Sequence, residues 1–156
     1  MSWLSDDVTV CTGYNVVKTN IDGSNLLLME DYPKQPIVKK LSDNLYLVKY
    51  SCGNYCRAHE FWSATKSDST DTLVAFNPQN QCLVEYDFNE NNNVTFTART
   101  LFNQNSKVIY TGIDMYQSVI IDNVVNEAKF VGNDLTMQLL GENWEDINVK
   151  IKDVCK

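Results

Sequence analysis

Cysteine and histidine, the residue types best suited to metal and nucleophilic chemistry, come together in one short segment. Cys52, Cys56 and His59 lie there at spacings of four and three residues. Thiols and imidazole bind zinc, a thiol beside an imidazole can act as a nucleophile, and two thiols can form a disulfide. Structural zinc needs four ligands, and the chain has one His and no second closely spaced Cys pair. We therefore expect no metal site.

A disulfide suits the two cysteines of this segment better. Strand-like residues flank them, so Cys52 and Cys56 are predicted to face each other across a hairpin with loop 53–55. Opposed strand residues have Cα atoms about 4.5–5.5 Å apart, which is within the roughly 4.4–6.8 Å that a disulfide spans. Strand residues three apart point to opposite faces, so Cys56 and His59 should not form a nucleophilic pair.

His59 is expected to be an ordinary, partly exposed strand residue that shares its face with Arg57 and Phe61. This parity leaves the imidazole without a nearby nucleophile.

The other three cysteines are predicted from their positions along the chain. Cys11 and Cys155 lie near the two ends, which are often close together in a domain, so we expect a second disulfide between them. Cys82 shares its strand parity with apolar residues and is expected to be a buried free thiol. Other pairings of the five cysteines stay open, because spacing alone does not fix connectivity.

Three segments show the period-two alternation of strands with one buried and one solvated face: 82–88, 94–99 and 147–152. Leu83 breaks the pattern in the first of them. Glu85 and Asp87 are expected on a solvated acidic face, and Arg99 on the solvated face of the second segment.

Weaker strand patterns and frequent turn residues fill most of the remaining chain. Strands are predicted at 45–50, 72–76, 108–113 and, less regularly, 118–131, with a hairpin of 8–19 and 26–30 around 21–24. The sequence thus predicts an all-β fold with at most one short helix, an antiparallel sandwich or barrel-like arrangement. With 156 residues and no evident linker, we expect one domain spanning 1–156.

The charge of the chain narrows the classes of partner. A formal net charge of −7 disfavours nucleic acids and anionic membrane surfaces and would attract a basic protein. No apolar run approaches the roughly 18–20 residues that cross a bilayer, so we expect no membrane insertion.

The sequence has no phosphate-binding loop, dinucleotide fingerprint, zinc-protease motif or hydrolase nucleophile motif. We therefore expect no enzyme activity and no cofactor. Tryptophan is a frequent anchor at protein interfaces. The candidate binding residues are two tryptophans and the acids beside the second of them: Trp62, Trp144, Glu142, Glu145 and Asp146.

The segment Tyr50-Ser51-Cys52-Gly53-Asn54-Tyr55-Cys56, followed by a strand, resembles a segment of small exported proteins of Gram-negative bacteria. Some of these proteins are of the immunity kind, which neutralise secreted antibacterial toxins. The resemblance implies a periplasmic or secreted location and a toxin or effector protein as partner. Because residues 1–7 do not resemble a signal peptide, that location requires a leader that was removed, and a cytoplasmic protein is the alternative.

Three functions follow as hypotheses. The leading one is an immunity or inhibitor protein that occludes the active site of a secreted bacterial toxin. The second is a lipocalin-like envelope protein that binds a small molecule in an apolar cavity. The third is an enzyme that uses Cys52, Cys56 or His59.

Overall fold

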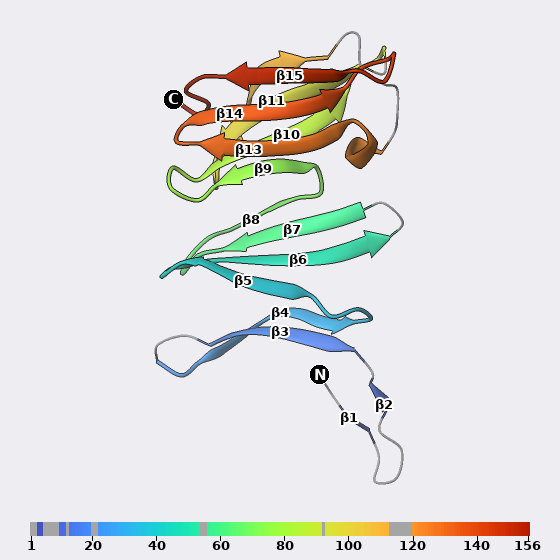
Figure 1. Ribbon diagram of the computed structural model, residues 1–156. Coiled ribbons are helices and arrows are strands. Elements are labelled where there is room, and N and C mark those ends of the chain that lie inside the picture. The colour runs from blue at the N-terminus through green and yellow to red at the C-terminus, as the bar shows by residue number, and fades with distance from the viewer. Residues whose placement is uncertain are drawn as a thin grey trace.

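The computed structural model describes residues 3–4, 10–11, 13–19, 22–53, 56–91, 93–112 and 120–156, with the backbone alone at 3–4, 10–11, 52–53 and 56. Within these ranges the chain forms antiparallel strands and a single turn of 3-10 helix, η1 (Ile121–Asn123). Figure 1 shows the strands as a stack of sheets. The predicted all-β class is confirmed, and these sheets do not close into a barrel.

Each sheet is a meander, in which neighbours in the chain are neighbours in space. The two small sheets pair β1 (Trp3–Leu4) with β2 (Val10–Cys11), and β3 (Tyr14–Thr19) with β4 (Asn25–Tyr32). One four-stranded sheet holds β5 (Ile37–Ser42), β6 (Leu45–Gly53), β7 (Cys56–Trp62) and β8 (Ser67–Thr70). The next holds β9 (Leu73–Asn77), β10 (Cys82–Phe88), β11 (Val94–Thr100) and β12 (Lys107–Thr111). The last holds β13 (Val125–Val131), β14 (Asp134–Leu140) and β15 (Asp146–Ile151).

Most predicted strands are present, and the predicted hairpin of β3 and β4 is confirmed. Strands β1, β5, β8 and β14 were not predicted. The signal for β14 was in the sequence, because Leu135, Met137 and Leu139 alternate with their neighbours and are buried. The predicted strand at 118–131 is partly wrong: η1 precedes β13, and residues 118–119 lie outside the described residues.

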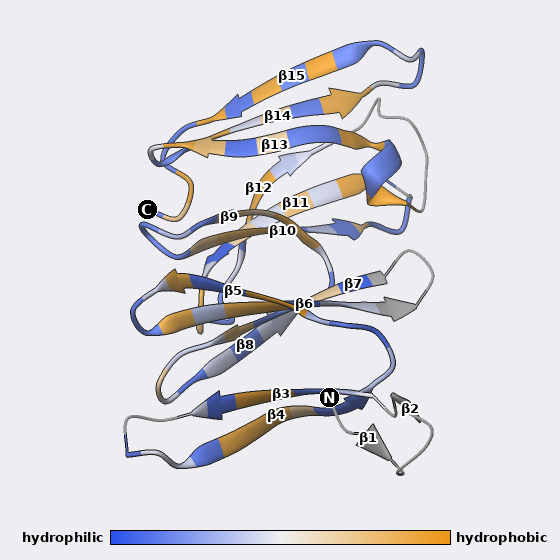
Figure 2. Cartoon of the chain, turned by 60° about the horizontal axis from the view of Figure 1, so that its bottom comes forward, coloured by the Kyte–Doolittle hydropathy of each residue, from blue (hydrophilic) through white to orange (hydrophobic). Residues whose placement is uncertain are grey.

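The β9–β12 sheet is the middle layer of the stack. The β13–β15 sheet covers one of its faces, and the β5–β8 sheet covers the other, with the β3–β4 hairpin beyond it; Figures 1 and 2 show this order in two views. In Figure 2, polar and apolar residues alternate along β13 and β15, as expected for a sheet with one face turned to solvent.

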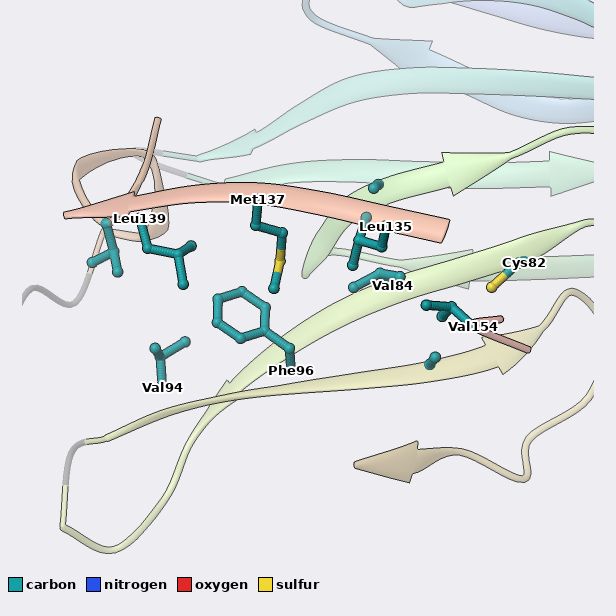
Figure 3. Packing of buried hydrophobic residues seen from close by; sticks show 11 residues of the cluster. Cys82, Val84, Val94, Phe96, Leu135, Met137, Leu139 and Val154 are labelled. Atoms are coloured by element: carbon teal, nitrogen blue, oxygen red, sulfur yellow. The ribbon is translucent and has the colours of Figure 1, made fainter. Parts of the chain in front are cut away.

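The larger core lies between β10–β11 and β14. Leu135, Met137 and Leu139 of β14 point toward Val84 and Phe96 in Figure 3. All five side chains are buried, and Phe96 has no exposed surface. Burying such side chains contributes about 1.5–3 kcal/mol each, so this contact is a main source of stability.

A second core fills the space between the middle sheet and the β5–β8 sheet. It contains Leu45, Leu47 and Phe61 of the β5–β8 sheet together with Leu83 and Leu101. Leu83 broke the predicted alternation because it faces this second core. The expectation of one solvated face on β10 and β11 is therefore wrong, since a sheet is stacked on each side of them.

A disulfide links Cys82 at the start of β10 to Cys155, with Cα atoms 5.8 Å apart. This pairing contradicts both the predicted Cys11–Cys155 bridge and the predicted free thiol at Cys82. The chain after β15 turns back onto the middle sheet, where Val154 is buried in the larger core, and that turn brings Cys155 to Cys82. The Cys11 side chain lies outside the described residues.

Candidate functional site

A solvent-open cleft of about 810 Å³ lies at one end of the second core. One wall comes from the β4–β5 connection and from β5, β6 and β7. The other comes from the first residues of β9, from Tyr86 of β10 and from η1. The face of β6 and β7 that carries Leu47 and Phe61 into the core carries Lys49, Arg57 and His59 into the cleft, because strand side chains alternate with period two. The cleft is thus the polar continuation of the core face.

His59 lies at the centre of this polar row. Its cross-strand partners are Lys49 on β6 and Thr70 on β8. The side chain shares its face with Arg57 and Phe61, as predicted, but only 9% of the residue is exposed. The expected partial exposure is wrong, because the middle sheet covers this face of β7.

The imidazole of His59 is held in its neutral form. Burial lowers its pKa below the ordinary 6.5, and the positive charge of Lys49 lowers it further, while the backbone carbonyls of Arg57 and Thr70 act in the opposite direction. Nδ1 is buried and has no hydrogen-bond partner within the described part of the chain. A buried polar atom without a partner costs about 1–3 kcal/mol, so this one needs an explanation.

Charged side chains line the cleft around His59. Lys34 and Lys49 lie on the β4–β5 and β6 walls, and Arg57 forms an ion pair with Asp122 at 3.3 Å that is largely exposed. Asp71 lies on the wall beside β9. Cations therefore outnumber carboxylates in the lining, whereas the whole chain has 20 acidic and 13 basic residues.

Two tyrosines complete the walls. Burial raises the pKa of Tyr50 to about 12, supported by its hydrogen bond to Glu60 at 2.7 Å. Burial also raises the pKa of Tyr86, and the carboxylates of Asp71 and Asp122 add to this effect. Both phenols stay protonated at neutral pH, so they offer hydrogen bonds and ring surface rather than charge.

A buried ion-pair network joins the β5–β8 sheet to the β9–β12 sheet. Arg99 of β11 contacts Asp68 of β8 at 2.5 Å and Glu85 of β10 at 2.7 Å. Burial alone would raise the pKa of Asp68, but hydrogen bonds from Arg99 and from the Phe102 N–H, at 2.7 Å, outweigh it and lower the pKa. The same two carboxylates raise the pKa of Arg99 against the effect of its burial. Both carboxylates are therefore engaged by Arg99.

This network corrects two expectations. Glu85 was predicted to lie with Asp87 on a solvated acidic face, and Arg99 on a solvated face. Only Asp87 is exposed, since the β5–β8 sheet covers the surface that holds Glu85 and Arg99.

The predicted binding residues fall into two separate places. Trp144, Glu142 and Glu145 form the turn between β14 and β15 with Asp146 at the start of β15, and all four are exposed. Trp62 ends β7 in another sheet, and in Figure 1 the arrowhead of β7 lies at the opposite side of the molecule from this turn. The structure therefore does not bring the two tryptophans together.

Backbone hydrogen bonds define the conformation of the turn at Trp144. Trp144 is 70% exposed and has φ of 65°, a left-handed value that is rare for bulky residues. Backbone hydrogen bonds from Gly141 N–H to the Glu145 carbonyl, at 2.8 Å, and from Trp144 N–H to the Gly141 carbonyl, at 3.1 Å, close the turn. Trp62 differs, because it is half-buried and donates its indole N–H to Glu60 at 3.0 Å.

The Cys52–Cys56 hairpin is present, but its register differs from the prediction. Cys56 pairs with Gly53 rather than Cys52, across residues 54–55, and the ladder shifts between Ser51 and Gly53. Both cysteine side chains lie outside the described residues, so the bridge between them stays a prediction. Where side chains are described, no three His, Cys, Asp or Glu residues gather as metal ligands would.

The cleft was missed at the sequence level, although a signal for it was present. Lys49 and His59 occupy positions of the parity that holds Leu47 and Phe61 in the core. Polar residues that continue a core face indicate a place where the two layers separate.

Comparisons with known proteins identify no relative of this chain. No family model, curated protein or solved structure matches this chain. Within the described ranges, no helix has the length and apolar character needed to span a bilayer.

Proposed function

We propose that this chain is a protein-binding inhibitor of the immunity kind, which occludes the active site of a secreted bacterial toxin, and that it is not an enzyme. The observation that carries the proposal is the β14–β15 turn, where Trp144 is 70% exposed among Glu142, Glu145 and Asp146. Tryptophan is enriched among the few residues that dominate binding energy at interfaces. The three acids beside it would steer a partner with a basic site.

The conformation of the turn supports the same role. A bulky residue at φ of 65° costs about 1–2 kcal/mol. Because backbone hydrogen bonds close the turn before binding, little backbone freedom is left to lose on association.

The ion pairs of two carboxylates support the part of the proposal that the chain is not an enzyme. Asp68 and Glu85 are both bound to Arg99, so neither is free to act as an acid or base. The Cys82–Cys155 disulfide is compatible with an oxidising compartment, and we propose the periplasm or the cell exterior.

The test uses a secreted antibacterial toxin encoded beside this gene. Toxin and chain are co-expressed, the complex is sought by size-exclusion chromatography, and its Kd is measured by calorimetry. Trp144→Ala should weaken binding by about 2 kcal/mol or more, roughly 30-fold. Val108→Ala is the control, since Val108 is 63% exposed on β12 in another sheet.

A second pair of variants tests the charges. Glu142→Gln with Glu145→Gln should slow association and reduce its salt dependence, whereas Glu30→Gln with Asp43→Asn removes equal charge from exposed positions elsewhere and should do neither. If the toxin forms no complex and cells expressing the chain are not protected, the proposed function is wrong. If the complex forms but Trp144→Ala binds normally, the function stands and the assigned surface is wrong.

A further inference from the structure

The cleft beside His59 is separate from the β14–β15 turn. It lies on the β5–β8 sheet, β9, β10 and η1, and none of the turn's residues lines it. A role in holding the fold together does not explain Lys34 and Lys49, since neither has an ion-pair partner among the described residues.

The charge of the cleft indicates the sign of its ligand. Arg57 is paired with Asp122, which leaves Lys34 and Lys49 against Asp71. In a chain of net charge −7, this local excess of cations is unusual. Both lysines would attract an anion in the cleft, and salt would screen this attraction only in part.

His59 indicates where the ligand would lie. It is nine-tenths buried, lines the cleft, and has a buried Nδ1 atom without a partner in the described part of the chain. A neutral imidazole carries one N–H, which can donate a hydrogen bond to an oxyanion. The cross-strand pairing of His59 with Lys49 places a charge next to that donor.

The rest of the wall indicates an organic ligand rather than a bare ion. Leu73, Val74 and Ile121 provide apolar surface, and Tyr86 provides an aromatic ring with a phenol hydroxyl that stays protonated at neutral pH. Most small-molecule sites combine such a lining with a few placed polar groups, and about 810 Å³ is within their usual size.

We propose that this cleft binds a small organic anion, a carboxylate or a phosphate monoester on a flat apolar body. The oxyanion lies between Lys49 and the imidazole of His59, with Lys34 nearby. The body packs against Leu73, Val74 and Tyr86. This retains small-molecule binding from the lipocalin-like alternative, but in an open, cationic cleft between stacked sheets.

The test relies on His59 as the single histidine of the chain. Its ring Cε1–H signal in a ¹H–¹³C NMR spectrum is therefore assigned without ambiguity. The probes are phenyl phosphate, benzoate and the neutral benzyl alcohol, each titrated at constant pH up to about 10 mM, which detects binding in the millimolar range. At least one anion should shift the signal saturably, and benzyl alcohol should not.

Matched charge variants locate the site. Lys49→Met should raise the Kd of the binding anion about tenfold, the cost of about 1.4 kcal/mol. Lys152→Met removes the same charge from an exposed position just after β15 and should change the Kd less than twofold. Lys34→Met is the substitute if Lys49→Met fails to fold, and Trp144→Ala should leave the titration unchanged.

Each outcome either supports the proposed anion site or contradicts it. A shift with phenyl phosphate alone, or with benzoate alone, supports the site and identifies its headgroup. The proposal is wrong if neither anion gives a saturable shift, if benzyl alcohol binds as well as they do, or if Lys49→Met and Lys152→Met behave alike. None of these results bears on toxin binding, which uses the opposite charge on a different sheet.

Discussion

Replacing Arg99 with methionine should destabilise the fold much more than replacing Arg57, although both arginines form ion pairs. The side chains of Arg99 and Asp68 are 5% and 3% exposed, and that of Glu85 is 15% exposed. Those of Arg57 and Asp122 are 75% and 63% exposed. Removing one partner of a buried pair costs about 3–5 kcal/mol because it strands a buried charge, whereas an exposed pair contributes about 0–1 kcal/mol.

The cost of Arg99→Met should lie at the upper end of the range for a buried pair. Its loss leaves two carboxylates, Asp68 and Glu85, without a cation between stacked sheets. Methionine retains much of the aliphatic volume, so a cavity adds little to the cost. The measurement is equilibrium unfolding in urea at pH 7, followed by tryptophan fluorescence, for wild type, Arg99→Met and Arg57→Met.

The pH dependence separates a stranded charge from simple loss of packing. In the wild type the pKa of Asp68 is lowered, so its contribution is present above the unfolded value of 3.8 and is lost as pH falls through the folded pKa. In Arg99→Met, burial without the cation raises that pKa, so stability is lost as pH rises through it. The deficit of the variant should therefore be largest near pH 7 and shrink toward pH 4.

Two results would refute this reasoning. One is an Arg99→Met variant within about 1 kcal/mol of Arg57→Met, which would mean that water or rearrangement solvates the two carboxylates. The other is a deficit independent of pH, which would assign the loss to packing. Arg99→Met with Asp68→Asn should recover part of the deficit, because it removes one of the two stranded charges.

Three further changes test other parts of the fold. Replacing Cys82 and Cys155 with alanine should cost roughly 4 kcal/mol in urea unfolding, because the bridge spans 73 residues; a cost below about 1 kcal/mol would contradict this. The wild type should lose stability as pH falls below 6.5, because unfolded histidine binds a proton that folded His59 resists, and His59→Gln should lack this component; parallel unfolding curves would contradict it. Trp144→Gly should change stability by less than about 1 kcal/mol, since the side chain is 70% exposed and glycine adopts φ of 65° without penalty; a larger loss would mean that the indole packs on the fold.

Part of the candidate sites could be predicted from sequence. The acidic turn around Trp144 was predicted as a binding element because a tryptophan flanked by acids is poorly suited to full burial, and it is exposed. The cleft was not predicted, since Lys34, Asp122 and His59 are far apart in the chain and meet only where separate sheets meet.

The sequence by itself determined the strands with strong alternation and the tight turns, because both depend on neighbouring residues. Strand β10 spans Cys82–Phe88, as its parity predicted. Tertiary structure decided which faces are buried: Leu83, Arg99 and His59 are inside because a second sheet lies over them. It also decided that Cys82 pairs with Cys155, since a disulfide requires two thiols to meet in space and spacing along the chain does not establish that.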